Sequence, residues 1–84
     1  MIALCDILRL DTLEENETAL VLKIQTDSDI KRRLWDLGVI ENAKITRLGS
    51  SPLGDPVAFM VKNTVIALRL VNCKQITVKK QVLA

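Results

Sequence analysis

The stretch Ser51-Pro-Leu-Gly-Asp-Pro-Val-Ala-Phe-Met-Val61 joins a dense turn signal to an apolar run. Both prolines of the chain and one of its three glycines fall in its first half. Pro52 suits the second position of a β-turn, and Gly54 suits a left-handed conformation at the end of that turn. Pro56 favours an extended Asp55, after which a strand can start. The stretch therefore predicts a tight loop that leads into a β-strand.

The residues before this loop predict a short helix over residues 28–37. The segment Thr-Asp-Ser-Asp at residues 26–29 offers several N-caps, and its acidic side chains favour the positive end of a helix dipole. Ile30, Leu34 and Leu37 then form one apolar stripe. A glycine follows the stripe, as is typical just after a helix, and the next residue can pack back on the helix.

Apolar and β-branched runs predict about five strands, one before this helix and four after it. They cover residues 18–25, 43–48, 57–61, 64–70 and 75–80. Lys62 and Asn63 form a two-residue link between two of them, which suits a primed hairpin turn. Closure into a barrel would remove exposed strand edges. We therefore expect a mainly β fold, a small barrel of about five strands with one short α-helix after the first strand.

The 84-residue chain has the length of one small domain, and its core must be mostly aliphatic because Trp35 and Phe59 are its only aromatic residues. Its net charge of +2 is too balanced to indicate a nucleic-acid-binding protein. No apolar run approaches the roughly 18 residues of a membrane span, and the N-terminal residues lack the features of a signal peptide. We expect a cytoplasmic protein with no direct membrane insertion.

Neither a catalytic centre nor a cofactor is expected. The chain has no histidine, so the commonest general base and the commonest metal ligand are both missing. Cys5 and Cys73 lack a CxxC spacing, and we interpret them as small buried hydrophobic residues, with a disulfide or a metal pair as the alternatives. Carboxylates are present, but none shows a spacing that predicts a metal site.

Three motifs, in order along the chain, resemble those of the FeoA family, the small cytosolic ferrous iron transport protein A. Lys31-Arg-Arg-Leu-Trp-Asp-Leu-Gly38 resembles the RRLLDLG helix of that family. Ser51-Pro-Leu-Gly-Asp-Pro56 resembles its APLGDP loop, and Ile66-Ala-Leu-Arg69 resembles its LALR strand. Each motif alone is weak, but the ordered set is specific.

The resemblance covers nearly the whole chain, from about Leu10 to Val78. It implies a single SH3-like β-barrel domain over residues 10–84, an N-terminal extension over residues 1–9, and no enzyme activity. A related SH3-like domain lies at the C-terminal end of iron-dependent repressors of the diphtheria-toxin-repressor type.

Three departures from the family pattern preserve the backbone that the pattern requires. Where the family commonly has glycine, this chain has Asn16, Asn42 and Asn63. Asparagine is the residue that, after glycine, best tolerates the left-handed region, so we expect positive φ angles at these positions. A fourth departure is Trp35, where the family often has leucine, and this side chain can belong to the core or to the surface.

The resemblance implies a role in bacterial ferrous iron uptake, with the FeoB-type membrane transporter and its cytosolic GTP-binding domain as the partner. A turn does not need a leucine at its tip, so Leu53 is either a preorganised contact for the partner or a side chain that packs under the end of the barrel. The basic helix residues either steer the chain to an acidic partner or form a solvated face. The predicted partner-binding residues are Pro52, Leu53, Gly54, Asp55, Pro56, Arg32 and Arg33.

Two other functions remain open from the sequence. An iron-binding sensor or chaperone of the same system would need carboxylate ligands, in a weak site or in one between subunits. An RNA-binding barrel would need a basic stripe and surface aromatic residues, which this composition disfavours. The sequence does not predict an oligomeric state.

Overall fold

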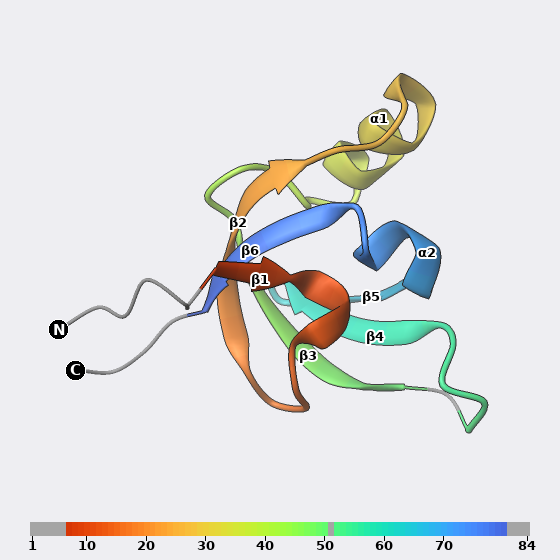
Figure 1. Cartoon of the computed structure of the whole chain (residues 1–84). Coiled ribbons are helices and arrows are strands. Elements are labelled where there is room, and N and C mark those ends of the chain that lie inside the picture. Colours follow the sequence, from red (N-terminus) through yellow and green to blue (C-terminus); the bar gives the residue numbers. More distant parts are fainter. Residues whose placement is uncertain (1–6, 51, 81–84) are drawn as a thin grey trace, which may run out of the picture.

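The computed structural model describes residues 7–50 and 52–80 (Figure 1). Six antiparallel strands form one sheet in the order β1-β6-β2-β3-β4-β5. The strands are β1 (Ile7–Arg9), β2 (Thr18–Ile24), β3 (Lys44–Ser50), β4 (Val57–Val61), β5 (Thr64–Leu68) and β6 (Ile76–Lys80). The helical segments are the 3-10 turn η2 (Leu10–Thr12) and the helices α1 (Ser28–Asp36) and α2 (Leu70–Cys73).

The mainly β class and the five expected strands are confirmed, but the predicted place of the helix is wrong. A sixth strand, β1, comes from residues 7–9, which the sequence assigned to the N-terminal extension. It pairs with β6 near the other end of the chain, so no local pattern marks it. Helix α1 therefore follows the second strand and not the first.

The sheet is open, in contrast to the closed barrel expected from the sequence. Strands β1 and β5 are the two ends of the strand order, and no pairing joins them within the described residues. After Leu68 the chain leaves the strand conformation and forms α2, which contacts η2. Because helical residues cannot continue a strand ladder, α2 and η2 cover this side of the core in place of strand pairing.

Helix α1 begins and ends as its sequence predicts. The Asp27 carboxylate accepts a hydrogen bond from the backbone N–H of Ile30 at 3.0 Å, which is an N-cap. At the other end Gly38 adopts a φ of +97°. The N–H of Val39 donates to the carbonyl of Leu34 at 2.8 Å in a Schellman motif, so the chain stops and folds back onto the core.

The expected left-handed residues are confirmed at three turns. The φ angles are +66° at Asn16, +71° at Asn42 and +64° at Asn63. Lys62, the first residue of the β4–β5 turn, also has a positive φ of +50°, so both central residues fit a type I′ hairpin. Asparagine thus adopts the left-handed conformation at the positions where the motifs that this chain resembles commonly have glycine.

The core is aliphatic apart from Phe59, which is fully buried. The other aromatic residue, Trp35, is 49% exposed and therefore lies on the surface, where the Nζ of Lys31 sits 5.5 Å from its ring centroid. Cys73 is buried with a free thiol, as expected of a small hydrophobic residue, whereas Cys5 lies outside the described residues.

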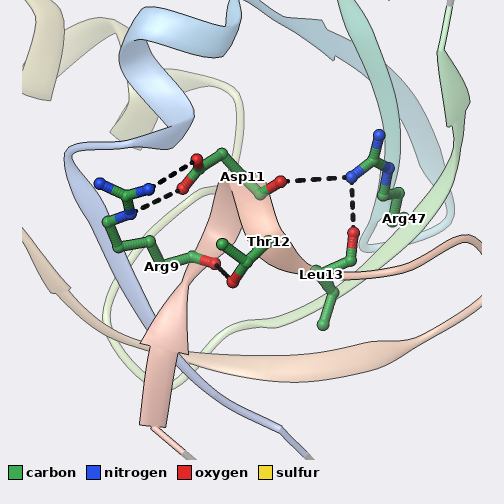
Figure 2. A network of polar contacts seen from close by, with 5 residues as sticks. All are labelled: Arg9, Asp11, Thr12, Leu13 and Arg47. Atoms are coloured by element: carbon green, nitrogen blue, oxygen red, sulfur yellow. Dashed lines mark hydrogen bonds and ion pairs between the residues drawn. The ribbon is translucent and has the colours of Figure 1, made fainter.

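A polar clamp fixes η2 against the sheet (Figure 2). The guanidinium of Arg47, on β3, donates to the backbone carbonyls of Leu13 at 2.6 Å and of Asp11 at 3.4 Å. Arg9 forms an ion pair with the Asp11 carboxylate at 3.1 Å, and the Thr12 hydroxyl donates to the carbonyl of Arg9 at 2.7 Å. Since the carbonyls of Asp11 and Leu13 lie outside the strands, Arg47 supplies the donors that the sheet does not.

Candidate partner-binding surface

The loop between β3 and β4 projects from the end of the sheet (Figure 1). Its tip residue, Leu53, is 94% exposed, the largest exposed fraction among the large hydrophobic residues described. Leu53 therefore does not pack under the end of the sheet, which was one of its two interpretations. Pro52 and Pro56 beside it are exposed as well.

One side-chain contact holds this loop in place. Gly54 adopts a φ of +86°, as its position in the turn predicted, and the Asp55–Pro56 peptide bond is cis. The Asp55 carboxylate accepts a hydrogen bond from the backbone N–H of Leu70 at 3.0 Å. That N–H belongs to the first turn of α2, so Asp55 satisfies a donor that the helix itself cannot. The loop is thereby tied to a second element.

The basic residues of α1 lie on different faces of the helix. Lys31 stacks over Trp35, and Arg32 is exposed away from the groove described next. Arg33 is also exposed, but it lines that groove. The run of three basic residues is therefore not one patch, and Arg33 alone of the three lines this groove.

The groove lies between α1 and the end of β5 and has a volume of about 150 Å³. Apolar side chains of α1, Ile30 and Leu34 among them, form one wall, and Ala67 of β5 lies on the other. Arg33 and Arg69 contribute the charged groups. Arg69 directly precedes Leu70, whose N–H is bound by the loop, so the groove and the loop are linked through the start of α2.

Sequence reasoning missed this groove, because its residues come from α1, β5 and α2, which are separate in the sequence. The basic side chain of Arg33 was the one signal that pointed to it. Arg69 lies in the motif that resembles the LALR strand of the FeoA family, but nothing in the motif assigns the arginine a role.

The described residues offer little for metal or acid–base chemistry. Within residues 7–50 and 52–80, no three side chains of His, Cys, Asp or Glu cluster in a way that could hold a metal ion. Burial, with help from the negative charge of Asp11, raises the pKa of the Cys73 thiol from 9.0 to about 12, so this thiol stays protonated near neutral pH. No helix in this part of the chain has the length and apolarity needed to cross a membrane.

A family model described as FeoA domain matches residues 8–80 of the chain. No curated protein matches the sequence. Among solved structures, the FeoA protein from Chlorobium tepidum is 29% identical with a TM-score of 0.85, over 89% of this chain and 71% of that one.

Two further structures share the fold. FeoA of Stenotrophomonas maltophilia, solved with zinc and described as an SH3 domain protein and a candidate ferrous iron transport activating factor, is 28% identical with a TM-score of 0.74, over 86% of this chain and 89% of that one. IdeR of T. acidophilum is 21% identical with a TM-score of 0.80, over 96% of this chain and 37% of that one, and this likeness concerns the fold alone.

Proposed function

This chain belongs to the FeoA family, and from that premise we propose that it is an accessory protein of bacterial ferrous iron transport that binds the FeoB-type membrane transporter and modulates it. The chain acts by docking and not by catalysis. The partner surface is the cytosolic GTP-binding domain of the transporter.

The exposed side chain of Leu53 is the observation that carries this proposal. A leucine that is 94% exposed contributes nothing to the core, yet its loop is held by a hydrogen bond to α2 and bounded by two prolines. A contact residue that is already fixed loses little conformational freedom on binding, so more of its burial contributes to affinity. Leu53 therefore supplies an apolar anchor, with Pro52 and Pro56 as its immediate surroundings.

Charge supplies the second part of the proposed interface. Arg32 and Arg33 are exposed on α1, and neither forms an ion pair within the described residues. Exposed basic side chains of this kind raise the association rate with an acidic partner more than they raise the affinity. The proposed dependence on Arg32 and Arg33 should accordingly weaken with rising salt.

The test is an amide-resolved NMR titration of the full chain with the GTP-binding domain of the transporter from the same organism. We expect amide chemical shift changes at residues 53–55, between the two prolines, and at the start of α2. Leu53→Ser should abolish these changes while the melting temperature stays close to that of the wild type, because a substitution at an exposed side chain rarely alters stability by more than about 0.5 kcal/mol.

Ile7→Ser is the matched control, since Ile7 is a 57% exposed aliphatic residue on β1, the edge strand of the strand order that is not next to the β3–β4 loop. It should bind as the wild type does. Unchanged binding by Leu53→Ser would refute the docking role of the loop. A large loss of stability in that variant would instead mean that Leu53 supports the fold.

A further inference from the structure

The groove between α1 and β5 has the size and lining of a side-chain pocket. Ile30, Leu34 and Leu37 of α1 face Ala67 of β5 across about 150 Å³, and Leu37 is still 39% exposed. An apolar cavity of roughly 150 Å³ holds a molecule the size of benzene. One leucine or phenylalanine side chain from another molecule therefore fits this space.

The charged side chains that line the groove are of one sign. Arg33 and Arg69 line it, and no carboxylate does. On the same helix, Asp29 and Asp36 lie one turn to either side of Arg33, yet no ion pair joins them to it within the described residues. Two guanidinium groups without carboxylate partners form strong, oriented hydrogen bonds when a carboxylate reaches them. The lining thus selects acidic ligands.

The groove also opens on an unpaired strand edge. The consecutive residues Ala67, Leu68 and Arg69 all line it, although side chains alternate between the two faces of a strand. Strand β5 is the last in the sheet order, so among the strands in residues 7–50 and 52–80 only β4 pairs with it. Ladder hydrogen bonds alternate from the pair Val61–Thr64 beside the two-residue turn, which leaves the N–H of Ala67 directed away from β4.

We propose that this groove binds an extended acidic segment of a partner protein, which inserts one apolar side chain, places carboxylates against Arg33 and Arg69, and pairs its backbone with the edge of β5 at Ala67. Pairing of an extended peptide with a free sheet edge is a common mode of peptide recognition. The inference rests on the proposed function, because the segment is assigned to the same transporter. The loop and the groove adjoin through Leu70, so one partner can contact both.

The test uses 15-residue peptides that tile the cytosolic segments of the transporter, titrated into the full chain in parallel with the whole GTP-binding domain. We expect one peptide in which apolar and acidic residues alternate to shift the amides of residues 67–69. Its binding should slow hydrogen exchange at the Ala67 amide. Arg33→Glu and Arg69→Glu should each weaken this peptide by about tenfold or more, because a charged hydrogen bond is replaced by repulsion.

Lys23→Glu is the matched control, because it makes the same charge change on an exposed residue of β2 outside the groove. It should alter the peptide affinity less than about twofold. Arg33→Gln and Arg69→Gln remove the charge without adding repulsion, and each should show a smaller loss of peptide affinity. They replace the glutamate variants if either of those folds poorly.

Failure of this inference is distinguishable from failure of the proposed function. If the GTP-binding domain binds through Leu53 while no peptide shifts residues 67–69, the groove inference is wrong and the proposed function stands. Unchanged peptide affinity in both glutamate variants would also overturn it. If neither the domain nor any peptide binds, both proposals fall.

Discussion

The carboxylate of Asp55 accepts a hydrogen bond from the backbone N–H of Leu70 at 3.0 Å, and this contact joins the β3–β4 loop to the first turn of α2. The two residues are far enough apart in the chain that neither local pattern predicts the contact. It gives the loop a fixed position relative to the groove, because Arg69, which lines the groove, is the neighbour of Leu70. Asp55 is a turn residue of the β3–β4 loop, and its carboxylate also caps the first turn of α2.

Asp55→Ala should lower the free energy of unfolding by about 1 kcal/mol, the usual loss when a helix-capping acceptor is removed. It should also speed hydrogen exchange at the Leu70 amide, which loses its acceptor. Equilibrium urea denaturation and amide exchange measure the two effects. Asp55→Asn keeps an oxygen acceptor and should lose less stability. Equal stability of the alanine variant and the wild type would contradict the capping role.

The double substitution Lys62→Asn and Asn63→Gly should stabilise the chain by about 1 kcal/mol. Both residues have positive φ angles, and the Asn-Gly pair is the preferred sequence for a type I′ turn. The urea midpoint should rise with an unchanged slope, which indicates a change of stability alone. Lys62→Ala is the control, since alanine gains nothing at a positive φ. A lower midpoint in the Asn-Gly variant would show that the Lys62 side chain has a role beyond the turn.

The Cys73 thiol should resist alkylation until the chain unfolds. Its side chain is buried, and burial raises its pKa to about 12, so the reactive thiolate is scarce at pH 8. The measurement is iodoacetamide labelling of a Cys5→Ser variant, followed by mass spectrometry across a urea series. Labelling should follow the unfolding curve. Rapid modification in the absence of urea would show that the region around α2 opens locally.

Glu17 should make the free energy of unfolding depend on pH. Its ion pair and hydrogen bond with Lys80 of β6, followed by the hydrogen bond from the Glu14 N–H, lower the pKa of Glu17 below its ordinary value of 4.5. A carboxyl whose pKa is lower in the folded state stabilises the fold above the unfolded value, and this contribution is lost as the pH falls through the folded value. The contribution should therefore be present at pH 7 and be lost progressively as the pH falls below the ordinary value of 4.5.

Glu17→Gln tests this pH dependence directly. The variant should be less stable than the wild type at pH 7, and the two stabilities should converge once the pH falls below the folded pKa of Glu17, because the wild-type carboxyl is then protonated. Thermal denaturation at a series of pH values measures the difference. A constant difference across the series would mean that Glu17 acts through packing and not through its charge.

Helix α1 was predictable because its signals are local. The N-cap at Asp27, the apolar stripe and the glycine stop all lie within the same short segment, and each favours the same boundaries. The left-handed asparagines were predictable for the same reason, since a positive φ is a property of one residue and its turn. The five longer strands also carried their own apolar pattern.

The features that sequence reasoning missed are non-local. Strand β1 has only three residues, and its partner β6 lies at the other end of the chain. The strand predicted over residues 64–70 ends at Leu68, and α2 begins at Leu70, whose N–H is bound by Asp55 from another loop. Of the candidate site residues, the sequence marked Leu53 and Arg33 individually. It could not show that Arg33 and Arg69 line one groove, because that depends on how α1 packs beside β5.

The pairing of Ile7 with Lys79 brings the two described ends of the chain together at one corner of the sheet. Figure 1 shows this corner on the side away from the β3–β4 loop. A short linker could therefore join the two ends, and a circular permutant reopened elsewhere would keep the same sheet. A fluorescent tag or immobilisation handle introduced at this corner would likewise leave the β3–β4 loop accessible for binding measurements.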